Sequence, residues 1–206
     1  MPSRNIVKEF AADSYYHVYN RGVEKRPIFL DTKDYSVFLG LLKKYLTGET
    51  PNKENRHVFK NFQGELSLIA YCLMPNHLHL LFYQSTPTAV TELMRRVCTG
   101  YVMYFNHRHH RVGGLFEGIF RAARIDSDSY LHHISRYIHL NPEDYKNWAY
   151  SSYPVYKGVK KTVWVDTEPI LDLFNGSSTE YQKFLDDYVD SKAELAILKH
   201  QLANDL

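Results

Sequence analysis

Along the chain, short runs rich in aromatic and β-branched residues are separated by longer stretches whose apolar residues recur every three or four positions. The short runs predict β-strands and the longer stretches predict amphipathic helices. The expected elements are a strand over 15–20, a helix over 32–45, strands over 66–74 and 77–83, a helix over 89–106, an extended segment over 115–125 and a helix over 129–140. The last helix should end at Asn141-Pro142, because proline disfavours the helical conformation of the residue before it.

Two of the expected helices have a start signal and a clear inner face. Asp31 or Thr32 can cap the helix over 32–45, and Thr88 can cap the helix over 89–106. The polar segment over 47–58 predicts a loop. The stripe of apolar residues expected to be buried in the second helix is Val90, Leu93, Met94, Val97, Tyr101 and Phe105.

The order of these elements is strand, helix, strand, strand, helix, strand and helix, which suits an α+β fold with helices packed on a mainly antiparallel sheet. We therefore expect a ferredoxin-like or RRM-like sheet with helices on one face. This domain should occupy residues 1–165, and residues 166–206 should form an acidic, helical C-terminal extension. The apolar positions of the extension are Tyr181, Phe184, Leu185, Tyr188, Leu195 and Leu198.

A length of 206 residues, with 44% hydrophobic and 15% aromatic residues, suits one domain with a substantial core and excludes a disordered chain. No apolar run approaches the roughly 20 residues that a membrane helix needs, and the first residues lack the apolar stretch of a signal peptide. Cys72 and Cys98 form no CxxC motif. We expect a cytoplasmic protein, without a membrane partner, whose two thiols fill space in the interior.

The formal net charge is only +2, but the charges are unevenly distributed. From residue 165 onward acidic residues predominate. Between residues 95 and 124 the sequence has Glu117 as its only acidic residue, against Arg95, Arg96, Arg108, Arg111, Arg121 and Arg124. A guanidinium group can bind phosphate through two hydrogen bonds, so this window could attract a polyanion. A solvated basic face is the alternative.

Two histidines lie two positions apart in the apolar run LMPNHLHLLFY, residues 73–83. In a strand, His77 and His79 would project from one face, while Leu78, Leu80 and Phe82 would project from the other face into the core. Two imidazoles on one face can converge on a single cation at about 2.0–2.2 Å per ligand. The alternative is a pair of half-exposed histidines on a polar face of the sheet.

A third ligand could come from the helix that precedes Pro142. His133, Tyr137 and Asn141 follow each other at intervals of four residues, so they form a slowly drifting stripe on one helix face. Leu131, Ile134 and Ile138 can form the buried stripe beside it.

Four segments in this order resemble the HUH-type single-tyrosine transposases, and among these the branch associated with repetitive extragenic palindromes (REP). They are YHVYNRG (16–22), YCLMPNHLHLLF (71–82), FEGIFRA (116–122) and YLHHISRYIHLNP (130–142). The resemblance extends over roughly Ser14 to Tyr153. It implies that residues 1–165 form a catalytic domain that cuts and rejoins DNA.

The resemblance also implies roles for individual residues. His77 and His79 would bind a divalent metal, magnesium or manganese, with Asn141 as third ligand. Tyr137 would attack single-stranded or hairpin DNA and form a 5′-phosphotyrosine link. Such a protein would work at the nucleoid, as a monomer or a homodimer, with Tyr137 acting in cis or in trans. Its phosphate-contact candidates are Arg21, Arg95, Arg96, Arg108, Arg111, Arg121 and Arg124.

Two segments depart from the family pattern. Gly118-Ile119-Phe120 replaces a common Gly-Arg-Phe, and Tyr150-Ser151-Ser152-Tyr153 replaces a Trp-Ser-Ser-Tyr signature. Other residues have two readings. Tyr101, Tyr104 and Phe116 could stack on unpaired bases or fill the core, and His132 and His133 could assist proton transfer or pack on their helix.

Two other functions remain compatible with the sequence. The first is a domesticated protein that binds hairpin nucleic acid without cutting it. The second is a metal-dependent phosphoesterase that forms no covalent intermediate.

Overall fold

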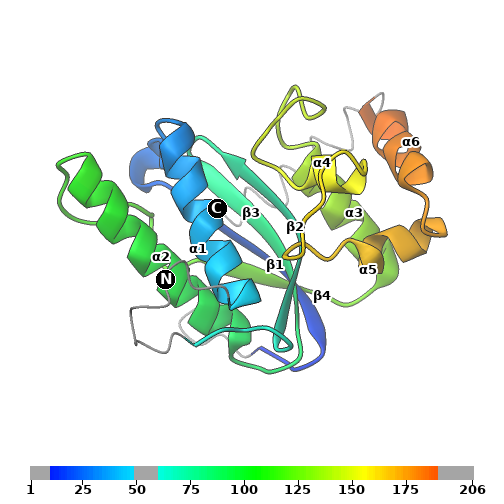
Figure 1. Ribbon diagram of the computed structural model, residues 1–206, viewed down its shortest axis with the longest axis horizontal. Helices are drawn as coiled ribbons and strands as arrows, with labels where there is room; N and C mark the ends of the chain where they lie inside the picture. Colours follow the sequence, from blue (N-terminus) through cyan, green and yellow to red (C-terminus); the bar gives the residue numbers. More distant parts are fainter. Residues whose placement is uncertain (1–9, 49–59, 190–206) are drawn as a thin grey trace, which may run out of the picture.

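The computed structural model describes residues 10–48 and 60–189. A four-stranded sheet lies at its centre in the order β2-β3-β1-β4, and neighbouring strands are antiparallel (Figure 1). The sheet consists of β1 (Ser14–Arg21), β2 (Leu66–Met74), β3 (His77–Gln84) and β4 (Arg121–Ile125). Helix α1 (Thr32–Thr47) connects β1 to β2, and α2 (Ala89–Arg108) connects β3 to β4. This is the ferredoxin-like arrangement, so the predicted fold class is confirmed.

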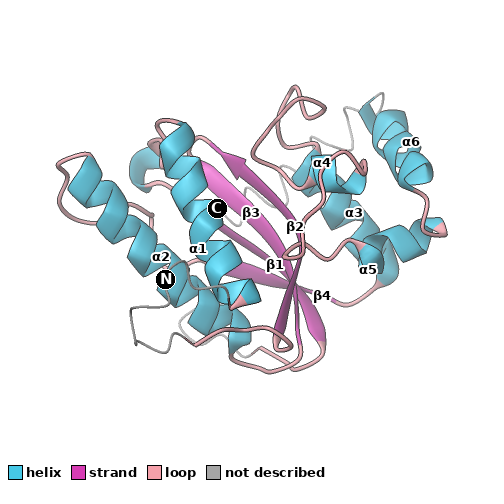
Figure 2. Ribbon diagram, in the orientation of Figure 1, coloured by secondary structure: helices cyan, strands magenta, loops and turns pink. Residues whose placement is uncertain are grey.

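Helices cover both faces of this sheet (Figure 2). One apolar cluster joins α1 and α2 to Leu78, Leu80 and Phe82 of β3. A second cluster, on the opposite face, joins Leu81 of β3 to the apolar residues of α3 (Asp128–His139). The expectation of helices on one face only is therefore wrong. Because the central strands carry apolar side chains on both faces, each face requires a covering layer.

The turn between β2 and β3, at residues 75–76, fixes where β3 begins. Its two carbonyl groups accept hydrogen bonds from the backbone N–H groups of Gly22 and Ile28. The end of β1 is thereby held beside the start of β3, and the register places Arg21 opposite His77.

Side-chain caps mark the starts of α1 and α3, whereas Thr88 at the start of α2 makes no side-chain cap hydrogen bond. The Asp31 side chain accepts hydrogen bonds from two backbone N–H groups at the start of α1, and the Ser127 side chain accepts one from Tyr130. The predicted inner stripe of α2 is buried throughout. The extended segment expected over 115–125 is a strand only from Arg121, because Phe116 makes an isolated bridge to Gly22 instead.

The C-terminal region is helical as far as it is described. It contains α4 (Tyr153–Tyr156), α5 (Glu168–Leu171), the 3-10 turn η2 (Asp172–Phe174) and α6 (Ser178–Val189); a further 3-10 turn, η1, spans Val23–Lys25. Leu195 and Leu198 of the expected extension lie outside the described residues. The division of the chain at residue 165 stays a prediction. Within residues 10–48 and 60–189, no helix combines the length and apolar character needed to cross a membrane.

Residues from this C-terminal region cover the outer edge of β2. The backbone N–H groups of Leu73, Ser152 and Asp166 donate to the carbonyl groups of Tyr150, Tyr71 and Leu68, respectively. The edge strand therefore has hydrogen-bond partners on both sides over much of its length.

Candidate functional site

Successive side chains of β3 point to opposite faces of the sheet, as the sequence predicts. His77 and His79 lie on the face of the sheet that α3 covers, opposite the apolar side chains of Leu78 and Leu80. His79 is buried, with 2% of its surface exposed. The alternative of two half-exposed histidines on a polar face therefore does not describe His79.

Helix α3 brings the other two predicted residues to these histidines. The Tyr137 ring lies 5.2 Å from the His79 ring, measured between centroids, at an interplanar angle of 82°. Asn141 follows the end of the helix, and its Oδ1 lies 3.0 Å from Nε2 of His77. The structure therefore assembles His77, His79, Tyr137 and Asn141 within one chain.

A third histidine, His17 of β1, completes the group. Its Nε2 lies 3.0 Å from Nδ1 of His79, and both rings are buried. His17 also makes an edge contact with Tyr137, at 6.1 Å between ring centroids. The sequence motifs alone do not single out His17. Strand alternation over 15–20 could have indicated it, because alternation puts His17 and Tyr19 on the same face of β1.

Burial determines the protonation state of this pair. Burial lowers the pKa of His17 to about 3, and burial together with the charges of His17, His77 and Arg21 holds the pKa of His79 well below its ordinary value. Both imidazoles are therefore neutral at neutral pH, the form that binds cations. If Nδ1 of His79 donates to His17, Nε2 of His79 carries a free lone pair.

The arrangement fits a divalent cation. Nε2 of His79 is buried and has no hydrogen-bond partner among residues 10–48 and 60–189. His77 Nε2 and Asn141 Oδ1 lie 3.0 Å apart, a hydrogen-bond distance that is also the separation of two adjacent ligand atoms about 2.1–2.2 Å from one metal. Within the described ranges no group of three His, Cys, Asp or Glu residues could hold a metal. The candidate site instead combines two imidazoles with an amide.

The Tyr137 phenol is neutral in this environment. Burial raises its pKa to about 12, although a hydrogen bond with Asn141 and the nearby charge of Arg21 oppose the increase. A nucleophilic role would therefore require removal of the phenol proton during attack.

The predicted phosphate-contact arginines lie on two sides of the sheet. Arg121 is opposite Tyr19 in β1, and Tyr19 is opposite His79 in β3, so Arg121 shares the face of the site. Arg21 is opposite His77 on the same face, and its Nε is buried without a hydrogen-bond partner among the described residues. The remaining candidates lie on α2, just after α2 or on the other face of β4: Arg95, Arg96, Arg108, Arg111 and Arg124.

Arg108 joins α2 to α1. Its two terminal nitrogens lie 2.6 Å from a carboxylate oxygen of Asp31 and 2.7 Å from one of Asp34. Burial alone would raise the pKa of Asp34, but hydrogen bonds from Leu30, His109, Tyr104 and Arg108 outweigh burial and lower it. This network gives Arg108 a structural role at the contact between the helices.

The other candidate residues differ in burial: Tyr101 is buried, Tyr104, Phe116 and His132 are partly buried, and His133 is exposed. Tyr101 is fully buried and its hydroxyl donates to the Ile28 carbonyl, while Tyr104 and Phe116 are partly buried against the same cluster. His132 contacts the ring of Phe174, and His133 lies 2.8 Å from a guanidinium nitrogen of Arg136. These contacts support packing roles.

The two departures from the family pattern lie in different environments. Ile119 is 77% exposed in the loop before β4. Tyr150 stacks on Tyr35 with ring centroids 3.6 Å apart. Tyr150 therefore has a packing role like that of a tryptophan, whereas Ile119 contributes no charge to the surface.

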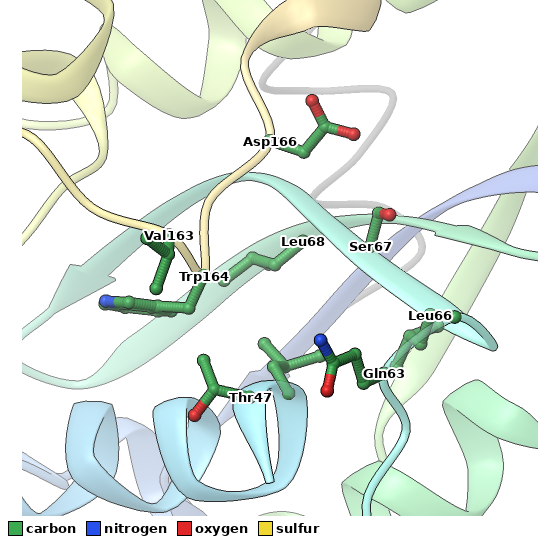
Figure 3. A pocket seen from close by; sticks show the side chains of 10 residues that line it. Thr47, Gln63, Leu66, Ser67, Leu68, Val163, Trp164 and Asp166 are labelled. Atoms are coloured by element: carbon green, nitrogen blue, oxygen red, sulfur yellow. The ribbon is translucent and has the colours of Figure 1, made fainter. Parts of the chain in front are cut away.

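A separate pocket of about 320 Å³ opens near the start of β2, at the end of the strand away from His77 (Figure 3). Its walls are formed by Leu46, Thr47, Gln63, Gly64, Leu66, Ser67, Leu68, Val163, Trp164 and Asp166. It is therefore distinct from the histidine and tyrosine cluster.

Comparison with known proteins gives two kinds of similarity. Residues 42–141 match the family model described as "Transposase IS200 like". The structure of a REP-associated tyrosine transposase bound to a REP hairpin has a TM-score of 0.55 at 15% identity, covering 80% of this chain and 93% of that chain. A Deinococcus radiodurans R1 crystal structure assigned as a transposase has a TM-score of 0.39 at 19% identity, covering 67% of this chain and 95% of that chain. Curated proteins give no match.

Proposed function

Because residues 42–141 match the model of the IS200-like transposase family, we propose that the protein nicks and rejoins single-stranded hairpin DNA through Tyr137, with a divalent metal on His77, His79 and Asn141. The observation that carries this proposal is the meeting of Tyr137 and Asn141 with the two histidines of β3 in one chain. A partner subunit is not needed to complete this group, so we propose that Tyr137 acts in cis.

The proposed reaction is a transesterification. The Tyr137 hydroxyl oxygen attacks phosphorus, the bond from phosphorus to O3′ breaks, and the phenol proton is lost while O3′ gains one. The products are a 5′-phosphotyrosine link and a free 3′-OH, so one ester bond replaces another. Attack of a 3′-OH on this link rejoins the strand and restores the phenol.

The residues around Tyr137 favour this reaction. Arg21 is opposite His77 on the face of the site, where its guanidinium group could bind the phosphate under attack. Asn141 forms a hydrogen bond with the phenol and holds its position. When bound, a magnesium or manganese ion would polarise the phosphate and stabilise the leaving oxygen.

Hairpin DNA is the substrate that we propose for two reasons. The structurally similar REP-associated transposase is bound to a REP hairpin, and Arg21 and Arg121 lie on the face of the site, where they can bind phosphates.

The central test is Tyr137→Phe, with Tyr130→Phe on the same helix as matched control. A labelled hairpin with a single-stranded tail is incubated with manganese, and covalent adducts are separated on a denaturing gel. We expect Tyr137→Phe to form no adduct and to bind the hairpin with unchanged affinity, because only the attacking oxygen is lost. An adduct that persists in Tyr137→Phe would refute the assignment of the nucleophile.

The metal ligands are tested by His77→Ala and His79→Ala, with the exposed His107→Ala as control. We expect both site variants to lose cleavage and high-affinity manganese binding by calorimetry, whereas His107→Ala keeps them. Cleavage by wild-type protein in excess chelator would contradict the metal role. Cut strands without any adduct would favour a phosphoesterase, and tight hairpin binding without cutting would favour a domesticated binding protein.

A further inference from the structure

The helix that carries Tyr137 is held from the side away from the sheet by α6. Tyr181, Phe184 and Tyr188 of α6 contact two α3 residues that lie close to Tyr137 in sequence. These residues are Arg136 and His139, and both are buried. Figure 1 shows α6 and α5 on the side of α3 that faces away from the strands. We call Tyr181, Phe184 and Tyr188 the α6 clamp.

His139 forms part of a continuous chain of hydrogen bonds from α6 to β2. Its Nδ1 lies 2.7 Å from the Tyr181 hydroxyl, and its Nε2 lies 2.7 Å from Oγ of Ser152. Oγ of Ser152 accepts from the Tyr71 N–H and lies within hydrogen-bond distance of the Tyr71 carbonyl. A neutral imidazole has one donor and one acceptor nitrogen, so the His139 ring can bridge Tyr181 and Ser152 in either tautomer.

Arg136 makes the second attachment. The guanidinium carbon lies 3.3 Å from the centroid of the Tyr188 ring and 4.4 Å from that of Phe184. Arg136 is only 7% exposed. A buried cation packed against two aromatic rings of α6 is attracted to them, so this contact also holds α3 against α6.

These contacts fix the rotation of α3 about its own axis. Tyr137 lies between the two attached positions in sequence, but its ring points to His79. A rotation of about 10° would move an atom ~6 Å from the helix axis by roughly 1 Å. A misplacement of this size can lower a reaction rate by about 100-fold.

We propose that the α6 clamp, acting through His139 and Arg136, sets the position of Tyr137 for attack. Tyr181 and His139 are positioning residues and do not touch the reacting atoms. The C-terminal extension therefore contributes to the reaction rate although it lies outside the site. This inference rests on the proposed function, since it assigns a role in the same strand transfer.

The test compares Tyr181→Phe with Tyr156→Phe. Tyr156 is an ideal control, because it is fully buried in the same cluster and its hydroxyl donates to the Ile69 carbonyl of β2. Each variant loses a buried hydroxyl, but only the Tyr181 hydroxyl forms hydrogen bonds to α3, with His139 and Ser135. Adduct formation is measured in single turnover at saturating hairpin with manganese, well below the melting temperatures of both proteins.

We expect Tyr181→Phe to slow adduct formation at least tenfold, with hairpin affinity within twofold of wild type. Tyr156→Phe should change the rate less than twofold, even though its melting temperature falls by a similar amount. Arg136→Gln should slow the reaction in the same way. Equal rates for Tyr181→Phe and Tyr156→Phe would overturn the proposal.

A readout without chemistry separates this inference from the proposed function. If wild-type protein forms no adduct, the proposed function fails, and amide hydrogen exchange then decides the role of the clamp. Faster exchange over residues 128–139 in Tyr181→Phe than in Tyr156→Phe would support a clamp on α3. Identical exchange in the two variants would refute it.

Discussion

At the scale of single residues, His79 is the most constrained member of the candidate site. Its Nδ1 lies beside His17, its Nε2 is buried without a partner among the described residues, and its ring contacts Tyr137. A neutral imidazole has one donor and one acceptor nitrogen, so the partner of Nδ1 determines which nitrogen can bind a metal. His17 therefore has the position of a residue that selects the tautomer of His79.

We predict that His17→Phe weakens manganese binding by about 10–100-fold, the usual effect of losing a partner of a metal ligand. Phenylalanine keeps the ring but cannot accept the proton of His79. His17→Gln, whose side-chain carbonyl can accept that proton, should recover part of the affinity. Calorimetric titration with manganese measures both. Equal affinity in His17→Phe and wild type would rule out this role.

The sequence could predict some of these residues and not others. The position of His77 and His79 on one face follows from strand alternation, and the four-residue spacing of Tyr137 and Asn141 follows from the helix period. Their roles came from the resemblance and stay predictions, although residues 42–141 match the model of the IS200-like transposase family. The contact between His17 and His79 depends on the register of β1 against β3, which is set by tertiary pairing.

At the scale of elements, strands and helices with a strong period and a clear boundary were predictable. β2 and β3 have nearly the expected limits, because the turn at residues 75–76 interrupts an apolar run. α3 was expected, but its coverage of the second face was not. The decisive feature is the apolar character of both faces of β2 and β3, exemplified by Leu80 and Leu81, which belong to different clusters.

The contact between α1 and α2 allows a stability prediction. Asp34→Asn should lower the free energy of unfolding by about 2 kcal/mol at neutral pH, because it removes a buried charge that accepts several hydrogen bonds. Chemical denaturation measures this difference. A loss below about 0.5 kcal/mol would show that the network contributes little.

The same substitution has a defined pH dependence. Because the folded protein lowers the pKa of Asp34, its stabilisation is complete above the ordinary carboxyl pKa of 3.8 and is lost as the pH falls through the lower folded value. The stability difference between wild type and Asp34→Asn should therefore shrink in acid. A stability difference between wild type and Asp34→Asn that grows below pH 3.8 would contradict a lowered pKa of Asp34 in the folded protein.

At the scale of the whole molecule, the basic window of the sequence does not form one surface. Residues 95–111 lie on or just after α2, whereas Arg121 lies across the sheet on the face of the site. The sequence could not reveal that the arginines of α2 lie on a different face from Arg121, because this separation depends on which face of the sheet α2 covers.

Salt dependence can show which side binds DNA. Arg21→Gln combined with Arg121→Gln should reduce the slope of log affinity against log salt by about 2, or about 1 for each lost phosphate contact. Arg95→Gln, on α2, should leave the slope unchanged. Hairpin binding by fluorescence anisotropy at several salt concentrations provides the measurement. A slope that falls in Arg95→Gln but not in the double variant would place the DNA on the face that α1 and α2 cover.

The covered outer edge of β2 has a consequence for folding. β2 can pair with β3 as soon as both are synthesised, but the partner of Tyr71 on its other side, Ser152, lies 81 positions later in the chain. Closing so long a loop is slow, and an apolar edge strand left open during that time can pair with another chain. A growing chain on the ribosome therefore exposes this edge until residues 150–166 emerge. Pairing of this edge with another chain is therefore favoured until residues 150–166 cover it.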